Sequence, residues 1–267
     1  MRLAIEAMLD YSMAQPADVL LAIEVAELFD QTILEDRLTI DGVDALRPVP
    51  GDDAIGRRTW MRADGHFHAE YRATVDVDRL LVPLDGLGCA PRRELPPGVI
   101  PYLWPSRYCE ADRFEAFVRR EFADLSGGAQ VEAMADWIHG HLDYCAGASD
   151  ANTTAADTFV SRQGVCRDFA HLMASFARAA GIPARLVSAY AFDLQPPDFH
   201  AVVEVWLDGG WRIIDATRLA PAEGIARIAV GRDATDIAFM TVFGTATLNQ
   251  QTVKVERIDE GAAPDRG

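Results

Sequence analysis

The sequence predicts an α+β protein in which an N-terminal antiparallel β domain precedes a second domain, where a helix packs on an antiparallel sheet. Three observations favour this class. Hydrophobic residues alternate along the first 80 residues, five prolines interrupt any regular element between residues 91 and 105, and helical and then strand periods fill the rest. We therefore place the domain boundary near residue 100, with domains at 1–100 and 101–267.

The elements of the first domain are predicted from patterns of period two. Apolar side chains alternate with their neighbours through residues 19–27, which is typical of a strand. Between residues 58 and 75, Asp64-Gly65 separates two alternating arms, and this dipeptide is a strong hairpin signal. Little in this part of the chain indicates a helix. The prolines between residues 91 and 105 then predict a linker.

Two helices are expected next, followed by a polar loop, a short helix before Gly164 and three further strands. Asp112 and Glu115 are spaced as a capping pair for the first helix, and Gly127 is placed to end it. The strands are expected within 184–192, 199–207 and 210–219. The apolar faces of the two helices are formed by Phe114, Phe117, Val118, Phe122 and Leu125, and by Val131, Met134, Ala135, Ile138 and Leu142.

Composition and charge exclude several classes of protein. The 267 residues are 49% hydrophobic and 25% charged, as in ordinary globular proteins, and no apolar run is long enough for a membrane span. The formal charge of −16 disfavours nucleic acid as a partner. We expect no signal peptide, because no basic stretch and long apolar core open the chain. Four irregularly spaced cysteines do not suggest a disulfide framework, so we expect a cytoplasmic protein.

Cys166 is the cysteine whose placement suggests reactivity. A helical stripe begins at Phe169, and Gly181 and Pro183 are placed to end it, so a helix is predicted over 165–180 with Cys166 in its first turn. The positive end of the helix dipole stabilises a thiolate, which is the nucleophilic form of cysteine. The alternative is a buried cysteine that acts as a small apolar side chain. We interpret Cys89, Cys109 and Cys145 as structural.

A nucleophilic thiol needs a base, and the base needs a partner that orients it. Residues 199–207 and 211–217 both alternate, and Asp208-Gly209-Gly210 between them predicts a hairpin turn. A loop of Gly209-Gly210 would place Glu204 opposite Asp215, whereas a loop from residue 207 to 210 would place Val202 there. Both registers put His200 and Asp215 on one face, and the longer loop makes them diagonal neighbours.

The segments GVCRDFAHL and DFHAVVEVWLDGGWRIIDAT, with the order Cys–His–Asp, resemble the bacterial transglutaminase-like superfamily, whose core is papain-like. The resemblance covers roughly residues 100–250, and the β-rich first part is similar to the region that often precedes this core. It implies that Cys166 is the nucleophile, that His200 is the general base and acid, and that Asp215 orients His200. Members of the superfamily include cross-linking enzymes and peptidases, and some have lost activity.

The resemblance also implies an oxyanion hole. The backbone N–H of Cys166 is the natural first donor. Family members often use an upstream aromatic side chain as the second donor, and Trp137 and Tyr144 are the candidates. We expect thiol-dependent acyl transfer on a peptide or protein substrate, with hydrolysis as the outcome. A protein-glutamine transglutaminase and a non-enzymatic peptide-binding module are the alternatives.

Other constellations are weaker. His66-x-His68 and His139-x-His141 could suggest metal ligands, and His141 with Cys145 is an i, i+4 pair, but no third ligand has convincing spacing. No glycine-rich phosphate loop is present. We therefore expect no metal and no cofactor.

Overall fold

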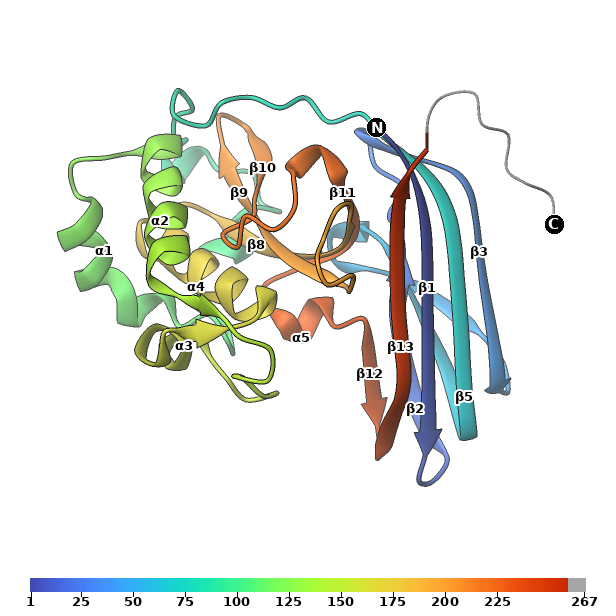
Figure 1. Ribbon diagram of the computed structural model, residues 1–267. Helices are drawn as coiled ribbons and strands as arrows, with labels where there is room; N and C mark the ends of the chain where they lie inside the picture. Colours follow the sequence, from blue (N-terminus) through green and yellow to red (C-terminus); the bar gives the residue numbers. More distant parts are fainter. Residues whose placement is uncertain (259–267) are drawn as a thin grey trace.

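The computed structural model describes residues 1–258, and a long antiparallel sheet lies beside a part that combines helices with a second sheet (Figure 1). The predicted α+β class is confirmed. The first sheet is formed by β1 (Arg2–Met13), β2 (Ala17–Glu24), β3 (Gln31–Val43), β4 (Arg47–Pro50), β5 (Arg57–Val77), β12 (Met240–Phe243) and β13 (Ala246–Arg257).

The hairpin predicted at Asp64-Gly65 is wrong, because β5 runs through it as one strand of 21 residues. β2 pairs with the first half of β5, with Ala17 opposite Ala63, and β1 pairs with the second half, with Ser12 opposite His66. Gly65 adopts a φ of 68° within the strand. The Asp-Gly dipeptide indicates only a local backbone preference for a turn. Pairing of β2 and β1 along the two halves of β5 instead keeps it a single continuous strand.

The last two strands return to the first sheet. β12 pairs with β2 and β13 pairs with β1 (Figure 1), although our division of the chain places them in the second domain. The boundary at residue 100 stays a prediction, and residues 259–267 lie outside the described residues. The inner face of this sheet is apolar, and Tyr190, Ala226 and Ile228 of the second part pack into the same core.

The second sheet has the strand order β10-β9-β8-β11, and all its neighbours are antiparallel. The proline-rich segment before it forms short 3-10 turns and no longer element. The strands are β8 (Ala184–Ala191), β9 (His200–Leu207), β10 (Gly210–Ile214) and β11 (Ile225–Gly231), and a separate two-stranded pair is β6 (Asp143–Tyr144) with β7 (Gln163–Gly164). The helices are α1 (Glu115–Phe122), α2 (Gly127–His141), α3 (Ala155–Ser161), α4 (Cys166–Ala179) and α5 (Ala234–Ile237).

Both predicted helices before the polar loop are present, but the first is shorter than expected. Asp112 lies in a 3-10 turn without a capping side chain, and Gly127 begins α2 instead of ending α1. The reason is a close approach from another segment. The N–H of Gly128 donates to the carbonyl of Leu87 at 2.9 Å, and a Cβ on Gly128 would lie 1.5 Å from the carbonyl oxygen of Leu84. The lack of a side chain at these glycines therefore lets residues 84–88 pack closely against the start of α2.

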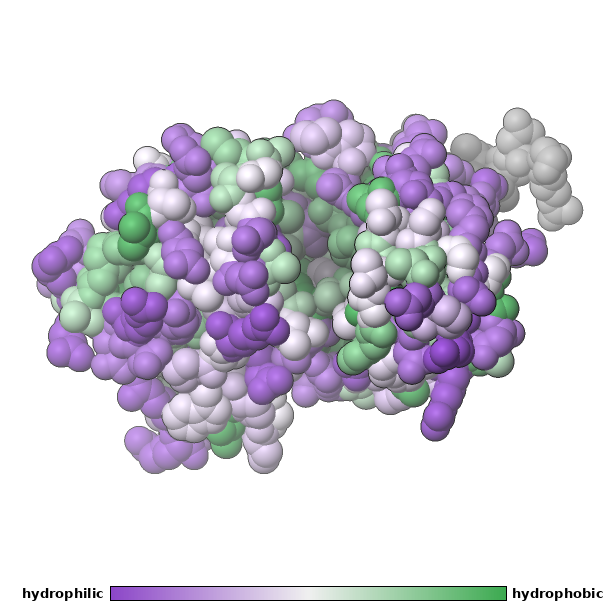
Figure 2. Space-filling view, turned by 90° about the horizontal axis from the view of Figure 1, so that it is seen from below, coloured by the Kyte–Doolittle hydropathy of each residue, from purple (hydrophilic) through white to green (hydrophobic). Residues whose placement is uncertain are grey.

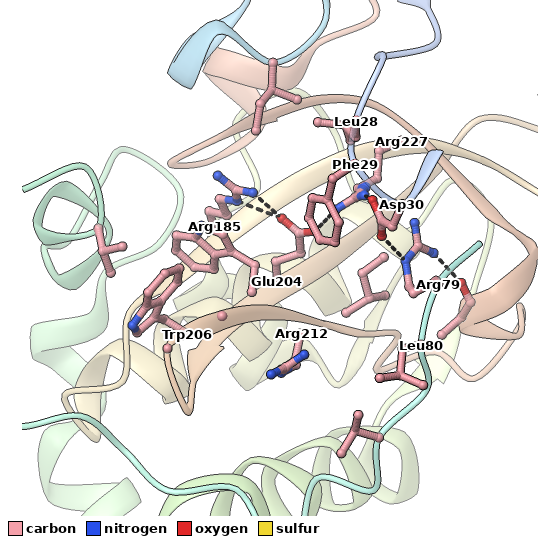
Figure 3. Close-up of a pocket in the computed structure, with 18 of the residues that line it drawn as sticks. Leu28, Phe29, Asp30, Arg79, Leu80, Arg185, Glu204, Trp206, Arg212 and Arg227 are labelled. Atoms are coloured by element: carbon pink, nitrogen blue, oxygen red, sulfur yellow. Dashed lines mark hydrogen bonds and ion pairs between the residues drawn. The ribbon is translucent and has the colours of Figure 1, made fainter. Parts of the chain in front are cut away.

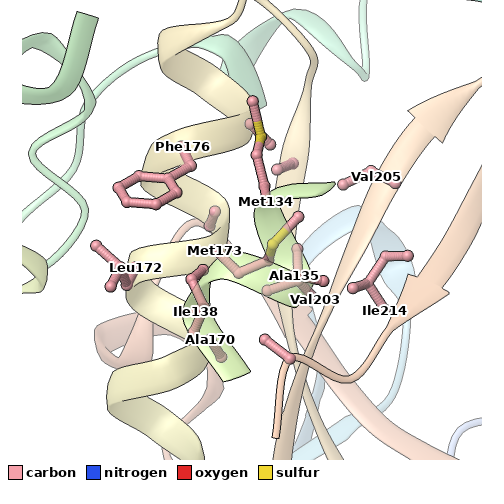
Figure 4. Close-up of a cluster of buried hydrophobic side chains, with 14 of the residues drawn as sticks. Met134, Ala135, Ile138, Ala170, Leu172, Met173, Phe176, Val203, Val205 and Ile214 are labelled. Carbon is pink, nitrogen blue, oxygen red and sulfur yellow. The ribbon is translucent and has the colours of Figure 1, made fainter. Parts of the chain in front are cut away.

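Helix α4 is the centre of the second part. Every residue from Asp168 to Arg178 is buried, and Leu172, Met173 and Phe176 pack with side chains of α2 and of the second sheet (Figure 4). A helix enclosed on all sides cannot shift without disturbing several neighbours. Its first residue, Cys166, is consequently held in a defined place.

The surface seen from below is mostly hydrophilic, with a hollow between the two parts whose walls include hydrophobic residues (Figure 2). No helix within residues 1–258 is both long enough and apolar enough to cross a membrane.

Candidate active site

The site begins at the N-terminus of α4, where Cys166 is the first helical residue after an extended Val165. The carbonyl of Val165 accepts hydrogen bonds from the N–H groups of Asp168 and Phe169, at 2.9 and 3.1 Å. In return, the carboxylate of Asp168 accepts from the N–H of Val165 at 2.9 Å. The predicted helix start and its end at Gly181, which has a φ of 80°, are confirmed.

Asp168 also connects this helix start to the polar loop before α3. Its buried carboxylate accepts from the hydroxyl of Ser149 and from the guanidinium of Arg167 at 2.9 Å, and Arg167 donates to the carbonyl of Asp150 at 2.8 Å. Asp168 was not among the site residues predicted from the sequence. The signal was available, because a carboxylate three residues after the N-cap is placed to bond back to the cap.

His200 and Asp215 come together across the β9–β10 hairpin. Nε2 of His200 lies 2.9 Å from Oδ2 of Asp215, and both side chains are at least nine-tenths buried. Asp215 follows the last residue of β10, and its carboxylate also accepts from the N–H and hydroxyl of Thr217, at 2.9 and 2.6 Å, and from the N–H of Ala220 at 3.1 Å. The sequence analysis did not identify Thr217, which fixes the carboxylate.

The hairpin adopts the second of the two registers considered above. Trp206 is opposite Trp211 and Val203 is opposite Ile214, which continues to Val202 opposite Asp215. The turn itself contains only Asp208 and Gly209, both with positive φ, at 50° and 74°. Two such residues make the turn that matches the twist of antiparallel strands.

The electrostatics of the pair favour a charged histidine. Burial alone would lower the pKa of His200, but the hydrogen bond that its ring donates to Asp215 and the neighbouring Cys166 raise it to about 9. Burial raises the pKa of Asp215, yet contact with His200 brings it below its ordinary value. Nε2 of His200 is occupied by Asp215, whereas Nδ1 is buried and has no hydrogen-bond partner within residues 1–258.

The two aromatic candidates have different surroundings. Tyr144, in β6, is placed beside α4 because β6 pairs with β7, directly before the helix. Burial and then the charge of the nearby Cys166 raise the pKa of Tyr144 to about 12, so its hydroxyl keeps its proton at neutral pH. Trp137 instead lies in an aromatic cluster, where it stacks on His141 and on Phe159 with ring centroids 4.3 and 5.6 Å apart.

The remaining histidine pairs do not gather ligands. His66 and His68 both contact the carboxylate of Asp10, and His141 bonds through Nδ1 to the carbonyl of Trp137 at 2.7 Å. In the described part of the chain, no three His, Cys, Asp or Glu side chains are arranged to hold a metal ion.

With this geometry established, the comparisons with known proteins identify the family. The family model of the transglutaminase-like superfamily matches residues 113–216, a range that contains Cys166, His200 and Asp215. The solved structure of a candidate cysteine protease from Cytophaga hutchinsonii is 34% identical, with a TM-score of 0.90, and the match covers 99% of this chain and 93% of that chain. The chain belongs to the transglutaminase-like superfamily.

Two curated relatives match shorter segments. An uncharacterized protein of Mycobacterium leprae is 33% identical over 116 residues, which are 40% of this chain and 42% of that protein. A protein-glutamine gamma-glutamyltransferase of Pseudomonas aeruginosa is 41% identical over 75 residues, which are 24% of this chain and 11% of that protein. The chain therefore matches less than half the length of each of these relatives.

Proposed function

We propose that this member of the transglutaminase-like superfamily is a cysteine peptidase or amidase with a Cys166–His200–Asp215 triad. The observation that carries the proposal is the 2.9 Å contact between Nε2 of His200 and Asp215, beside a cysteine at the first turn of a helix. The carboxylate orients the ring, so that Nδ1 serves the thiol. A pKa of about 9 for His200 keeps the ring protonated at neutral pH, which is the form that would pair with a Cys166 thiolate.

In the first half of the reaction, Sγ of Cys166 attacks the carbonyl carbon of an amide and forms a C–S bond. The carbonyl electrons move to oxygen, and the backbone N–H of Cys166 stabilises this oxyanion. We assign the hydroxyl of Tyr144 as the second donor, because β6 lies beside the start of α4 and the raised pKa of Tyr144 keeps this hydroxyl protonated. His200 gives its Nδ1 proton to the leaving amine as the C–N bond breaks, which leaves a thioester on Cys166.

In the second half, neutral His200 takes a proton from a water molecule as the water oxygen attacks the thioester. The C–S bond breaks, the carboxylic acid leaves, and the proton returns the pair to its resting charge. The same intermediate could instead be captured by a primary amine, which is the transglutaminase reaction. Hydrolysis is favoured by the relative that spans nearly the whole chain, which is named a candidate cysteine protease, whereas the gamma-glutamyltransferase matches 75 residues.

Selective alkylation tests the nucleophile. Limiting iodoacetamide at neutral pH should modify Cys166 before the other three cysteines, with the sites located by peptide mass spectrometry. Cys89 is the matched control, because it is exposed but burial of its sulfur raises its pKa. Labelling of Cys89 at the same rate as Cys166 in the folded protein would refute the assignment and favour the peptide-binding module.

The two acyl-transfer outcomes are distinguished by whether the thioester reacts with water or with an added primary amine. A peptide amide substrate incubated with increasing concentrations of a primary amine should yield mainly free acid if the protein is a hydrolase. Product that is mainly the substituted amide at millimolar amine would instead establish a transglutaminase. Replacement of Cys166 by Ala should abolish both products.

A further inference from the structure

One cavity of the described residues lies away from the triad, over one face of the second sheet and along its β10 edge. It has a volume of about 750 Å³, within the range of ligand-binding pockets, and none of Cys166, His200 and Asp215 lines it. One wall consists of consecutive residues 209–213 of the β9–β10 hairpin. A further part of the wall is the strap, which we define as residues 79–84, of which all but Pro83 line the cavity; Arg79 and Leu80 are labelled in Figure 3.

Strand β10 presents a free edge to this cavity. β10 is the terminal strand of its sheet, with β9 as its only strand neighbour in the described chain. The N–H of Trp206 on β9 donates away from β10, to the carbonyl of Pro183 at 2.9 Å. Its partner Trp211 therefore belongs to a non-hydrogen-bonded pair, and the N–H and C=O of Trp211 and of Ile213 point outward. Both residues line the cavity.

The strap also has free backbone groups. Hydrogen bonds hold the chain on either side of it. The N–H of Asp78 donates to the carbonyl of Asp30 at 3.0 Å, and the carbonyl of Gly88 accepts from the N–H of Asp208 at 2.9 Å. Between these points, the N–H and C=O groups of residues 79–82 form no hydrogen bond with any residue in 1–258. The side chains of Leu80 and Leu81 are 81% and 51% exposed. Two extended segments with unpaired backbone groups thus face one cavity.

The charges in the cavity wall favour a carboxylate. Arg185, Glu204, Arg227, Asp30 and Arg79 form a continuous buried chain of ion pairs (Figure 3). Four arginines line the cavity with only three carboxylates, in a chain whose formal charge is −16. Arg212 is the additional cation, and its buried Nε has no hydrogen-bond partner among the described residues. The guanidinium of Arg79, whose side chain is 9% exposed, also keeps one NH₂ group without a partner.

We propose that this cavity binds an extended peptide segment, which adds as a strand to the free edge of β10 and carries apolar side chains and one carboxylate. Backbone groups of the peptide pair with Trp211 and Ile213, its apolar side chains lie against Leu80 and the tryptophans, and its carboxylate pairs with Arg212. A strand-adding peptide satisfies a free edge that would otherwise template aggregation. The site is independent of the chemistry at Cys166.

Fluorescence anisotropy with the full chain tests the proposal. The probe is a fluorescein-labelled Thr-Val-Thr-Val-Glu-Val-Thr peptide, whose valines share one strand face and whose glutamate lies on the other, as Trp211 and Arg212 do on β10. Two further versions carry N-methyl groups on alternate backbone nitrogens, one version for each parity. Saturable binding of the parent is expected, and at least one N-methyl version should bind about tenfold more weakly, because two or more backbone hydrogen bonds are lost. Binding of both N-methyl versions as tightly as the parent, or no binding of the parent, would overturn strand addition.

The arginine is tested with a matched pair of variants. Arg212→Gln should weaken binding of the glutamate peptide about threefold or more, and should leave binding of a glutamine version unchanged. Arg119→Gln, on the exposed surface of α1, should change neither. Equal affinity of Arg212→Gln and the wild type for the glutamate peptide would overturn the carboxylate assignment. Binding should persist in Cys166→Ala, so a failure of the proposed chemistry and a failure of this site give different results.

Discussion

Asp215 and His200 form the best-defined pair among the individual residues of the site. The carboxylate has two separable effects on the ring: it orients Nε2 and it stabilises the positive charge. If the resting state is an ion pair with Cys166, the histidine already carries both protons. Its partner then needs to accept only one hydrogen bond, which an asparagine carbonyl can do.

We therefore expect Asp215→Asn to retain substantially more activity than Asp215→Ala, by roughly tenfold or more in kcat/KM. The alkaline limit of activity should also move to lower pH in Asp215→Asn, because the carboxylate that helps raise the pKa of His200 to about 9 is gone. The measurement is a pH profile of kcat/KM for folded wild type and both variants. Equal loss of activity in the two variants would show that the negative charge itself is required.

The β9–β10 turn is the element that sets the distance between His200 and Asp215. Gly209 has a φ of 74°, and a Cβ there would meet no atom within 4 Å, so only the backbone conformation resists a side chain. Gly140, in the last turn of α2, also has open space around it but no positive φ. An alanine would meet no steric obstacle at either position, so the comparison isolates the cost of the positive φ at Gly209.

Gly209→Ala should reduce the free energy of unfolding by about 1–2 kcal/mol, the cost of a left-handed alanine. Gly140→Ala should increase it by about 0.5–1 kcal/mol, because alanine favours the helix. Denaturant unfolding followed by circular dichroism measures both. A destabilisation of the same size in both variants would mean that crowding, and not backbone conformation, controls these positions.

Glu204 joins elements from across the whole molecule. It is completely buried and pairs with Arg185 of β8 and Arg227 of β11, at 2.7 Å each, while Arg227 continues to Asp30, which follows β2 in the chain. Removal of one partner leaves buried charges without compensation, which is far more costly than loss of a surface pair. The stability that this ion-pair network contributes is therefore expected to be lost when any one of its members is removed.

Glu204→Ala should lower the free energy of unfolding by about 3–5 kcal/mol. The matched control is Glu256→Ala, because Glu256 pairs with Lys254 at 2.9 Å while both side chains are more than half exposed. That change should cost less than about 1 kcal/mol. Urea unfolding of both variants provides the comparison, and a cost for Glu204→Ala as small as that of the control would contradict the role assigned to the network.

Two buried histidines give the stability of the molecule opposite dependences on pH. Burial lowers the pKa of His171, which lies within α4, from its ordinary value of 6.5 to about 4, whereas Asp215 and Cys166 raise that of His200 to about 9. Between pH 4 and 6.5 the unfolded chain binds a proton that folded His171 does not, so acid removes stability. Between pH 6.5 and 9 folded His200 holds a proton that the unfolded chain has lost, so alkali removes stability.

The contribution of these two histidines to the free energy of unfolding should therefore be greatest near pH 6.5 and should fall at lower and at higher pH. His171→Gln should flatten the acid side, and His200→Gln should flatten the alkaline side, while the exposed His139→Gln should leave both slopes unchanged. Urea titrations between pH 4 and pH 9 measure the slopes. An acid slope that survives in His171→Gln would assign the acid sensitivity to other groups.

The sequence alone determined the α+β class, the extent of α4 and the face shared by His200 and Asp215, because each follows from a local period. A helical stripe with Gly181 after it defines α4, and alternation along β9 and β10 preserves parity in either register. The glycine turn, however, allowed two registers. Only pairing along β9 decided that Asp215 lies opposite Val202, since hydrogen bonds between strands are not local.

The same reason explains what the sequence misassigned. Asp64-Gly65 has the composition of a turn, but β1 and β2 align along one edge of β5 and make it a single strand. Gly127 has the composition of a helix end, but contact with residues 84–88 makes it a beginning. The free edge of β10 and the strap are about 130 residues apart in the chain. Local preference indicates which elements can form, and contacts between distant segments decide which of them do and what lies between them.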